Sequence, residues 1–331
     1  MVLNNKLIDT ITDKHQKKMQ SERIIGSYSG KEKGPLLIVF GAMHGNEPAG
    51  VTALDLMFKM LEVEPITNPE FNFCGRIVGL VGNVRARREG VRFINRDLNR
   101  QWTPENVTRI QNSPIEELDE EDLEIKEVLE VVHHEIDTYQ PEKLVFLDLH
   151  TTTAFGGIFS IPQDNPESVR IAVELHAPVV KGMLNGIYGT TLHYFTNENF
   201  EPETVAVTFE SGQHDEELSV NRAIAALTNC MRTIGCVQEE HVENRHDAIL
   251  MEYSKGLPKI AELITIHRIV PEDDFRMAPN YKNFQPVKKG EVLAFDKKGQ
   301  IIAVEDGLVL MPLYQKQGDD GFFLIKTIEA F

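Results

Sequence analysis

Short apolar runs recur along the first two thirds of the chain, and glycine or polar residues follow each of them. Residues 36–40, 77–81, 144–149 and 205–209 are almost continuously hydrophobic, which is typical of strands buried on both faces. Such strands occur mainly in sheets that helices cover on both sides. The pattern therefore predicts a layered α/β architecture.

Between these runs, apolar residues recur at the three- and four-residue spacing of a helix. One predicted helix follows Pro48, a residue that suits a first helical position, and another occupies residues 219–234. A third lies in the acidic segment 116–135, where Ser113 and Glu116 match an N-cap and a capping-box glutamate. The acidic face of this helix is expected to be solvated.

The pattern changes near residue 243. Beyond it, short strand-like pieces with little helical periodicity are separated by turn signals. These signals are Lys289-Gly290, Lys298-Gly299, Asp306-Gly307 and Asp320-Gly321. We expect a main domain over residues 1–243, which carries the candidate chemistry described below, and a smaller all-β domain over residues 244–331.

The charge balance narrows the classes of partner. With 51 acidic and 34 basic residues, the formal net charge of the 331-residue chain is −17. Such a chain repels phosphate backbones and anionic membrane surfaces, so we expect no nucleic-acid or membrane partner. Three widely spaced cysteines predict no disulfide framework. Neither a secretory signal nor a membrane-spanning run is evident, and a cytoplasmic protein is expected.

Two histidines and a glutamate form the strongest candidate metal site. His44 and Glu47 follow the run 36–40, and His150 follows the run 144–149. The HxxE spacing alone is a weak signal, and an isolated strand histidine is more often a packed core residue. Together, the three residues form the two-histidine, one-glutamate set of catalytic zinc sites, which leaves a fourth position for water. Asp148 points to the same face as His150 and can orient it.

Glu210 stands at the end of the fourth apolar run. It is either a helix cap or a general base beside a metal-activated water, and the sequence does not separate these two roles. His214 is near enough in sequence to reach the same region, but a surface loop is favoured for it.

Three arginines lie within residues 92–100. In so acidic a chain this run indicates capture of an anion, because the guanidinium group matches a carboxylate in two hydrogen bonds. The alternative is a surface turn in which the arginines pair with Asp97, and for Arg96 this alternative is favoured.

These four motifs, in this order, resemble the succinylglutamate desuccinylase and aspartoacylase family of the zinc-carboxypeptidase-like fold. The matching strings are residues 41–47 (GAMHGNE), 92–100 (RFINRDLNR), 148–150 (DLH) and 208–210 (TFE). The resemblance implies a mixed sheet flanked by helices, and the turn-rich tail fits the C-terminal β-domain of the family.

The resemblance also implies roles for individual residues. One zinc ion per chain would be bound by His44, Glu47 and His150. Glu210 would activate the water, and Arg92 would polarise the scissile carbonyl or hold the oxyanion. Asn99 and Arg100 would bind a carboxylate of the amino-acid part of the substrate. A tyrosine of the β-domain reaches the pocket in aspartoacylases, and Tyr314 is the nearest candidate here.

The sequence departs from the family pattern in two places. Aspartoacylases carry a further arginine shortly before the catalytic glutamate, whereas residues 197–208 contain none. This difference argues against acetylaspartate as the substrate. Residues 48–50 also differ from the usual desuccinylase sequence.

The expected activity is hydrolysis of a small anionic N-acyl amino acid, and a homo-oligomer is compatible with the sequence. A zinc peptidase of the same fold is the first alternative, because the chemistry would be the same and only the pocket would be larger. A non-catalytic carrier module is the second, since Lys297 and Lys298 stand in a tight turn of the tail. A plain β-turn is favoured over that alternative.

Overall fold

The computed structural model describes residues 22–238 and 245–328. Most strands belong to one eleven-stranded sheet. Its order is β1 (Ile24–Ser29), β3 (Cys74–Val81), β2 (Glu32–Gly41), β4 (Lys143–Thr152), β7 (Glu203–Gln213), β5 (Phe159–Pro162), β6 (Val179–Lys181), β8 (Ile260–Arg268), β14 (Asp320–Ile328), β13 (Gly307–Leu310) and β10 (Gln285–Val287). A separate three-stranded sheet contains β12 (Gly299–Ile302), β11 (Val292–Asp296) and β9 (Arg276–Met277).

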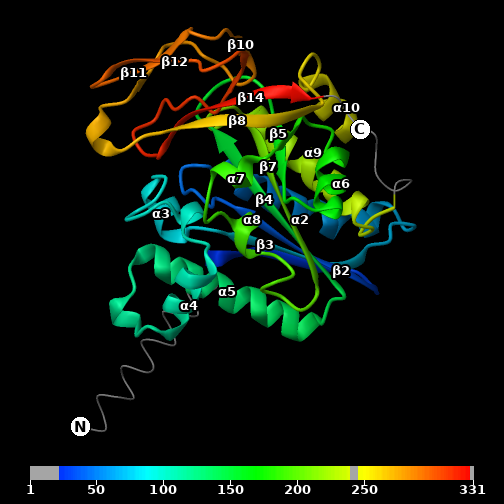
Figure 1. Cartoon of the computed structure of the whole chain (residues 1–331). Coiled ribbons are helices and arrows are strands. Elements are labelled where there is room, and N and C mark those ends of the chain that lie inside the picture. Colours follow the sequence, from blue (N-terminus) through cyan, green and yellow to red (C-terminus); the bar gives the residue numbers. More distant parts are fainter. Residues whose placement is uncertain (1–21, 239–244, 329–331) are drawn as a thin grey trace, which may run out of the picture.

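Helices flank the central part of the main sheet (Figure 1). The α-helices are α2 (Ala49–Thr67), α3 (Val84–Glu89), α4 (Pro104–Asn112), α5 (Glu120–Tyr139), α6 (Pro166–Glu174), α7 (Met183–Gly186), α8 (Thr191–Tyr194), α9 (Leu218–Thr233) and α10 (Arg245–Tyr253). Short 3₁₀ turns are η1 (Leu98–Arg100), η2 (Ile115–Glu117) and η4 (Pro271–Asp273). The mixed α/β architecture expected from the sequence is confirmed.

The four predicted strands are the central parallel strands β3, β2, β4 and β7. Side chains alternate between the two faces along each strand. In β2, Leu36, Ile38 and Phe40 pack with α4 and α5, whereas Leu37 and Val39 pack with α2 and α9. Both faces are therefore covered, which explains why these segments are almost continuously apolar.

The structure differs from the expected helix start in the acidic segment. Ser113 is the C-cap of α4, and the carboxylate of Asp119 accepts a hydrogen bond from the backbone N–H of Asp122 at the start of α5. The intervening residues form η2. The prediction that Ser113 caps the long helix is thus wrong, because the proline after it opens a 3₁₀ turn.

The C-terminal strands continue the main sheet. β8 pairs with the short β6, and β14, β13 and β10 extend the sheet in antiparallel fashion. The expected boundary at residue 243 lies outside the described residues, and the division into two domains stays a prediction. α10, which follows it directly, packs on the α9 side of the core, so this region is not purely β.

Lys297 and Lys298 lie in the turn between β11 and β12. The carboxylate of Asp296 accepts hydrogen bonds from the backbone N–H groups of Lys298 and Gly299, at 2.7 and 3.0 Å. This is the plain polar β-turn that the sequence favours.

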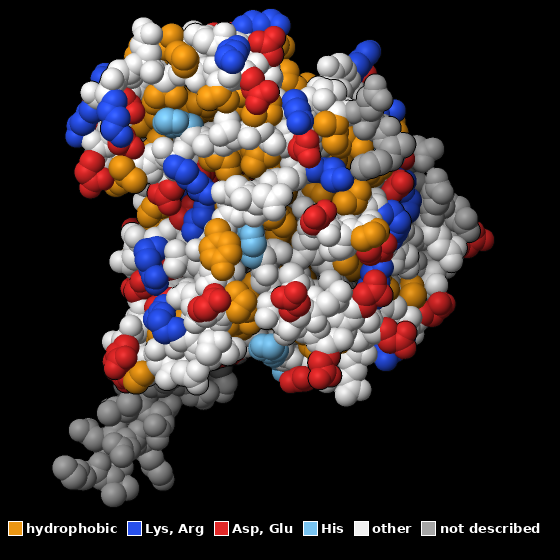
Figure 2. Space-filling view, viewed as in Figure 1, with side chains coloured by type: hydrophobic (Ala, Val, Ile, Leu, Met, Phe, Trp, Pro, Cys, Tyr) orange, Lys and Arg blue, Asp and Glu red, His pale blue; other side chains and the backbone are white. Residues whose placement is uncertain are grey.

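Acidic and basic side chains are interspersed on the face seen in Figure 2, where no broad basic surface appears. Cys74, Cys230 and Cys236 are all free thiols, in agreement with the absence of a disulfide framework. In the described part of the chain, no helix has both the length and the apolar character that a membrane crossing requires.

Candidate metal centre and active site

Three neighbouring parallel strands deliver the candidate residues to one edge of the sheet. His44 and Glu47 follow the end of β2, and His150 and Glu210 stand near the ends of β4 and β7. His150 and Glu210 are direct partners in the β4–β7 register. Carboxyl ends of parallel strands are where open α/β sheets form their ligand sites.

The loop after β2 is held tightly. Ala42 has a φ of 53°, in the left-handed region that residues other than glycine rarely adopt. The backbone of Gly45 approaches α3 so closely that a Cβ there would lie 2.2 Å from the carbonyl carbon of Ala86. The backbone N–H of Gly45 also donates to the carbonyl of Arg92. These contacts fix the positions from which His44 and Glu47 project.

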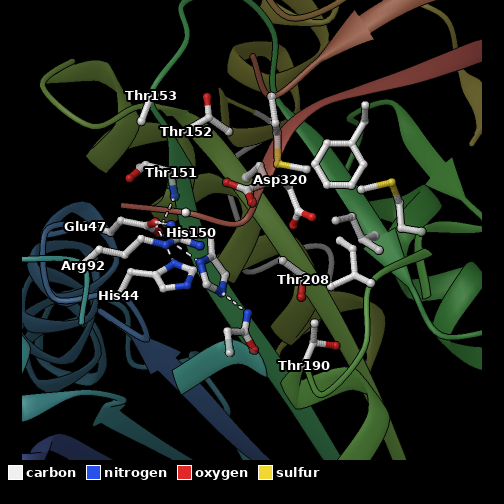
Figure 3. A pocket seen from close by; sticks show the side chains of 18 of the residues that line it. His44, Glu47, Arg92, His150, Thr151, Thr152, Thr153, Thr190, Thr208 and Asp320 are labelled. Atoms are coloured by element: carbon white, nitrogen blue, oxygen red, sulfur yellow. Dashed lines mark hydrogen bonds and ion pairs between the residues drawn. The ribbon is translucent and has the colours of Figure 1, made fainter. Parts of the chain in front are cut away.

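His44, Glu47 and His150 face one another in the interior (Figure 3). The Nδ1 atoms of His44 and His150 lie 2.8 and 3.0 Å from the two carboxylate oxygens of Glu47. One ligand atom from each of the three residues lies within 4.8 Å of the others. All three are buried, and the group can hold a metal ion.

A carboxylate lies behind each histidine. The Nε2 atom of His150 lies 3.0 Å from Asp148, and that of His44 lies 3.0 Å from Asp97. Such partners fix the tautomer and orientation of ligand histidines. The sequence predicts this position for Asp148, whereas it treats Asp97 only as a charge partner of the arginines. The signal for Asp97 is its place inside the arginine-rich run.

Arg92 contacts both the carboxylate behind His44 and the candidate ligand Glu47. Its Nε and Nη2 donate to Asp97 at 3.1 and 2.8 Å, and Nη1 lies 3.6 Å from Glu47. Burial lowers the pKa of Arg92, but Asp97 and Glu47 outweigh this effect and raise it, so the guanidinium stays charged. Arg96 pairs with Asp119 and Asp122. The predicted pairing of Arg96 with Asp97 is therefore wrong, because Arg92 occupies that carboxylate.

Glu210 lies inside β7, and α9 begins eight residues later, so the helix-cap alternative is wrong. Its side chain is buried, and its Oε2 atom has no hydrogen-bond partner among the described residues. Burial raises the pKa of Glu210 to about 8, with Glu47 and Asp148 adding to the effect and His150 and Arg92 opposing it. A carboxylate with a raised pKa and a free oxygen is suited to proton transfer near neutral pH.

Asn99 and Arg100 line the same pocket but are engaged within the protein. The side chain of Asn99 lies 3.4 Å from His150 Nε2 and accepts from the backbone N–H of Thr191. Arg100 donates to the carboxylate of Asp320 at 2.6 Å and to the carbonyl of Asn99 at 2.7 Å.

A cavity of about 110 Å³ connects these residues. His214 lines it: its Nδ1 lies 2.6 Å from the hydroxyl of Thr151, and its Nε2 is buried without a partner. The preference for a surface loop at His214 is therefore wrong, because the turn after β7 folds back over the site. Tyr314 does not line this cavity. Its hydroxyl bonds to the backbone of Ala278 and Tyr281 beside an adjoining open groove.

Comparisons with known proteins agree with the resemblance seen in the sequence. Residues 33–234 match the sequence model of the succinylglutamate desuccinylase/aspartoacylase catalytic domain. The chain is also similar to a probable aspartoacylase from Nostoc sp. (strain PCC 7120). The two are 23% identical over 298 residues, which cover 83% of this chain and 89% of the Nostoc protein.

Solved structures share the fold. A putative succinylglutamate desuccinylase/aspartoacylase family protein from Shewanella amazonensis aligns with a TM-score of 0.61 and 14% identity, over 92% of this chain and 94% of that one. The product-bound ectoine utilization protein EutE from Ruegeria pomeroyi aligns with a TM-score of 0.60 and 18% identity, over 91% and 88% of the two chains. At such identities the likeness establishes the architecture and not the substrate.

Proposed function

The chain belongs to the succinylglutamate desuccinylase/aspartoacylase family, and from this premise we propose that it is a zinc-dependent hydrolase that cleaves the amide bond of a small N-acyl amino acid. Enzymes of this family hydrolyse amide bonds. The observation that carries the proposal is the cluster of His44, Glu47 and His150 within 4.8 Å, with Glu210 on the adjacent strand.

The residues of the cluster fit a divalent zinc ion. Two imidazoles and one carboxylate are a ligand set of catalytic zinc sites, and each imidazole has a carboxylate behind it. Charge supports the same conclusion. The buried carboxylates of Glu47, Asp97 and Asp148 contact the two histidines, and Arg92 is the arginine that contacts these carboxylates most closely. A divalent cation would balance the excess negative charge.

Glu210 is the proposed general base. A zinc ion bound here would polarise the amide carbonyl and lower the pKa of a coordinated water. Glu210 takes a proton from the attacking water and passes it to the amine nitrogen as the carbon–nitrogen bond breaks. The Oε2 atom supports this role, because no residue in the described ranges forms a hydrogen bond with it. A cation beside Glu210 would lower its pKa from about 8 and thus favour the charged form that accepts the proton.

Arg92 is the proposed electrophilic partner. Its partly buried guanidinium lies beside Glu47 and is oriented by Asp97, so it can donate to the carbonyl oxygen on which negative charge develops. Arg100 and Asn99 are proposed to contact the carboxylate of the amino-acid part. Acetylaspartate is not the proposed substrate, because residues 197–208 contain no further arginine for its second carboxylate.

A peptidase is the alternative, and one observation favours it. An open groove lined by Asn46, Arg87 and Tyr314 adjoins the catalytic pocket and shares His214, Thr153 and Gln315 with it. An extended peptide could follow this groove.

A substrate panel tests the proposal. The purified protein would be assayed for amine release from acetyl, succinyl and longer acyl amino acids and from short peptides, before and after chelation and zinc addition. We expect zinc-dependent cleavage of acyl amino acids. Preferential cleavage of peptides would favour the alternative, and no zinc-dependent amide hydrolysis at all would refute the proposal.

A further inference from the structure

The catalytic pocket is apolar along the wall that lies away from the metal cluster. Its lining there comes from β5, from the segment that includes α7 and α8, and from the C-terminal region of the chain. The hydrophobic residues that line the pocket are Ile161, Met183, Leu184, Ile187, Leu192, Met311, Leu313 and Phe323. In Figure 3 the cluster lies on one side of the pocket, and side chains made mostly of carbon lie around and beyond Asp320.

This wall is part of the folded core. Ile161, Met183, Leu192 and Phe323 are buried members of one hydrophobic cluster, and Leu184 packs against it. Because these side chains are packed in the core, they keep their positions when a substrate enters. The surface that they present to the pocket therefore stays apolar. An apolar substrate group placed against it leaves water without losing hydrogen bonds.

The basic groups of the pocket are already paired. Among the residues that line it, the arginines are Arg92 and Arg100, and no lysine is present. Arg92 pairs with Asp97, and Arg100 pairs with Asp320 at 2.6 Å. Asp320 also contacts Arg268. Asp319 also lines the pocket, so little positive charge is left for a second carboxylate of the substrate.

Size limits the substrate as well. The cavity of about 110 Å³ is somewhat smaller than the roughly 150 Å³ of an engineered protein cavity that binds benzene. An apolar group of the size of a leucine side chain or a short acyl chain is comparable with this space.

We propose that the preferred substrate carries a single carboxylate and an apolar group next to the scissile amide, and that this apolar group contacts the wall around Met183, Leu184 and Phe323. The inference rests on the proposed hydrolase function and defines its substrate class. Asp320 is then a specificity-determining residue, because its carboxylate occupies Arg100 and repels a second carboxylate of the substrate.

A matched substrate set tests this inference. Acetylleucine places the apolar group on the amine side, and hexanoylglycine places it on the acyl side; acetylaspartate and succinylglutamate are the acidic counterparts. Burial of one methylene group corresponds to about a fourfold gain in kcat/KM. The leucine side chain and the hexanoyl chain each add about four such groups, so kcat/KM should rise on the order of 100-fold. We expect at least one apolar substrate to exceed both acidic ones by that factor.

Each outcome has a distinct meaning. Preference for acetylleucine or for hexanoylglycine supports the inference and identifies the side of the amide that meets the wall. Equal or higher kcat/KM for the acidic substrates would overturn the inference but leave the proposed hydrolase function intact. If the protein hydrolyses none of these four substrates and no other acyl amino acid, both the inference and the proposed hydrolase function are overturned.

Variants test the wall directly. Leu184→Lys places a cation in the pocket from a partly buried position, and Ile66→Lys is the control at a residue that is 78% exposed. We expect Leu184→Lys to lower the ratio of apolar to acidic kcat/KM at least tenfold without changing the zinc content of the folded protein, and Ile66→Lys to leave the ratio unchanged. If Leu184→Lys does not fold, Asp320→Asn is the second variant, for which the same ratio should fall. A ratio unaffected in a folded variant would contradict the inference.

Discussion

Asp97 links the candidate metal centre to Arg92, and its replacement by asparagine gives the sharpest structural prediction. The Asp97 carboxylate contacts His44 Nε2 at 3.0 Å and Arg92 at 2.8 and 3.1 Å, and only 3% of its side chain is exposed. Asparagine keeps the size of the side chain but removes the negative charge. His44 then loses the charged partner of its Nε2 atom, and the nearest carboxylate left beside Arg92 among the described residues is that of Glu47, at 3.6 Å.

Two effects of Asp97→Asn can be estimated. Loss of a carboxylate behind a ligand histidine typically weakens metal binding by about 10- to 100-fold, which equals about 1.4–2.7 kcal/mol. Removal of one partner of a buried ion pair costs about 3–5 kcal/mol. Because Glu47 still compensates Arg92 in part, we expect the chelated protein to lose about 2–3 kcal/mol of unfolding free energy.

Zinc affinity would be measured by competition with a chromophoric chelator, and stability by urea unfolding in the presence of excess chelator. Asp55→Asn is the matched control. Asp55 pairs with Lys59 on the surface, where both side chains are more than half exposed, so the change should be within about 1 kcal/mol and zinc affinity should not change. Asp97→Asn protein that binds zinc as tightly as the wild type and unfolds at the same urea concentration would refute the assigned role.

Three further predictions concern the base, the thiols and the loop. Glu210→Gln should lower kcat by about 10²- to 10⁴-fold while keeping bound zinc, and near-normal turnover would exclude Glu210 as the base. Burial raises the pKa of the Cys230 thiol to about 12, so the reactive thiolate is scarce at pH 8 and should increase only as the pH approaches that value. A thiol reagent at pH 8 should therefore label the partly exposed Cys74 rapidly and Cys230 only after unfolding; equal rates would contradict the described burial. Gly45→Ala should destabilise the protein by about 1–3 kcal/mol and weaken zinc binding, because its Cβ would overlap the backbone of α3; unchanged melting and zinc content would be inconsistent with that contact.

The sequence predicts the central sheet well because each central strand is buried on both faces. Continuous apolar runs identify β2, β3, β4 and β7 without any knowledge of their partners. β5 and β6 have four and three residues and are too short to form a recognisable pattern. Without them, the sequence gives no sign that the C-terminal strands continue the main sheet, because that continuity depends on the pairing of β6 with β8.

Some residues of the candidate site can likewise be predicted from the sequence, and others can be found only from the fold. His44, Glu47 and His150 can be found from the sequence because ligand-type residues at strand ends have a fixed geometric meaning. Asp320 could not be found, since its contact with Arg100 joins residues 220 positions apart. The expectation of a surface loop at His214 is wrong for a related reason: only the fold shows that the turn after β7 covers the pocket.

The central claim, that this chain is a zinc hydrolase, is tested most directly by the metal content of the active protein. Elemental analysis of the purified, catalytically active enzyme should find one zinc ion per chain, and the His44→Ala variant should contain none and be inactive. Full amide-hydrolase activity in a preparation without a stoichiometric divalent metal would contradict the account.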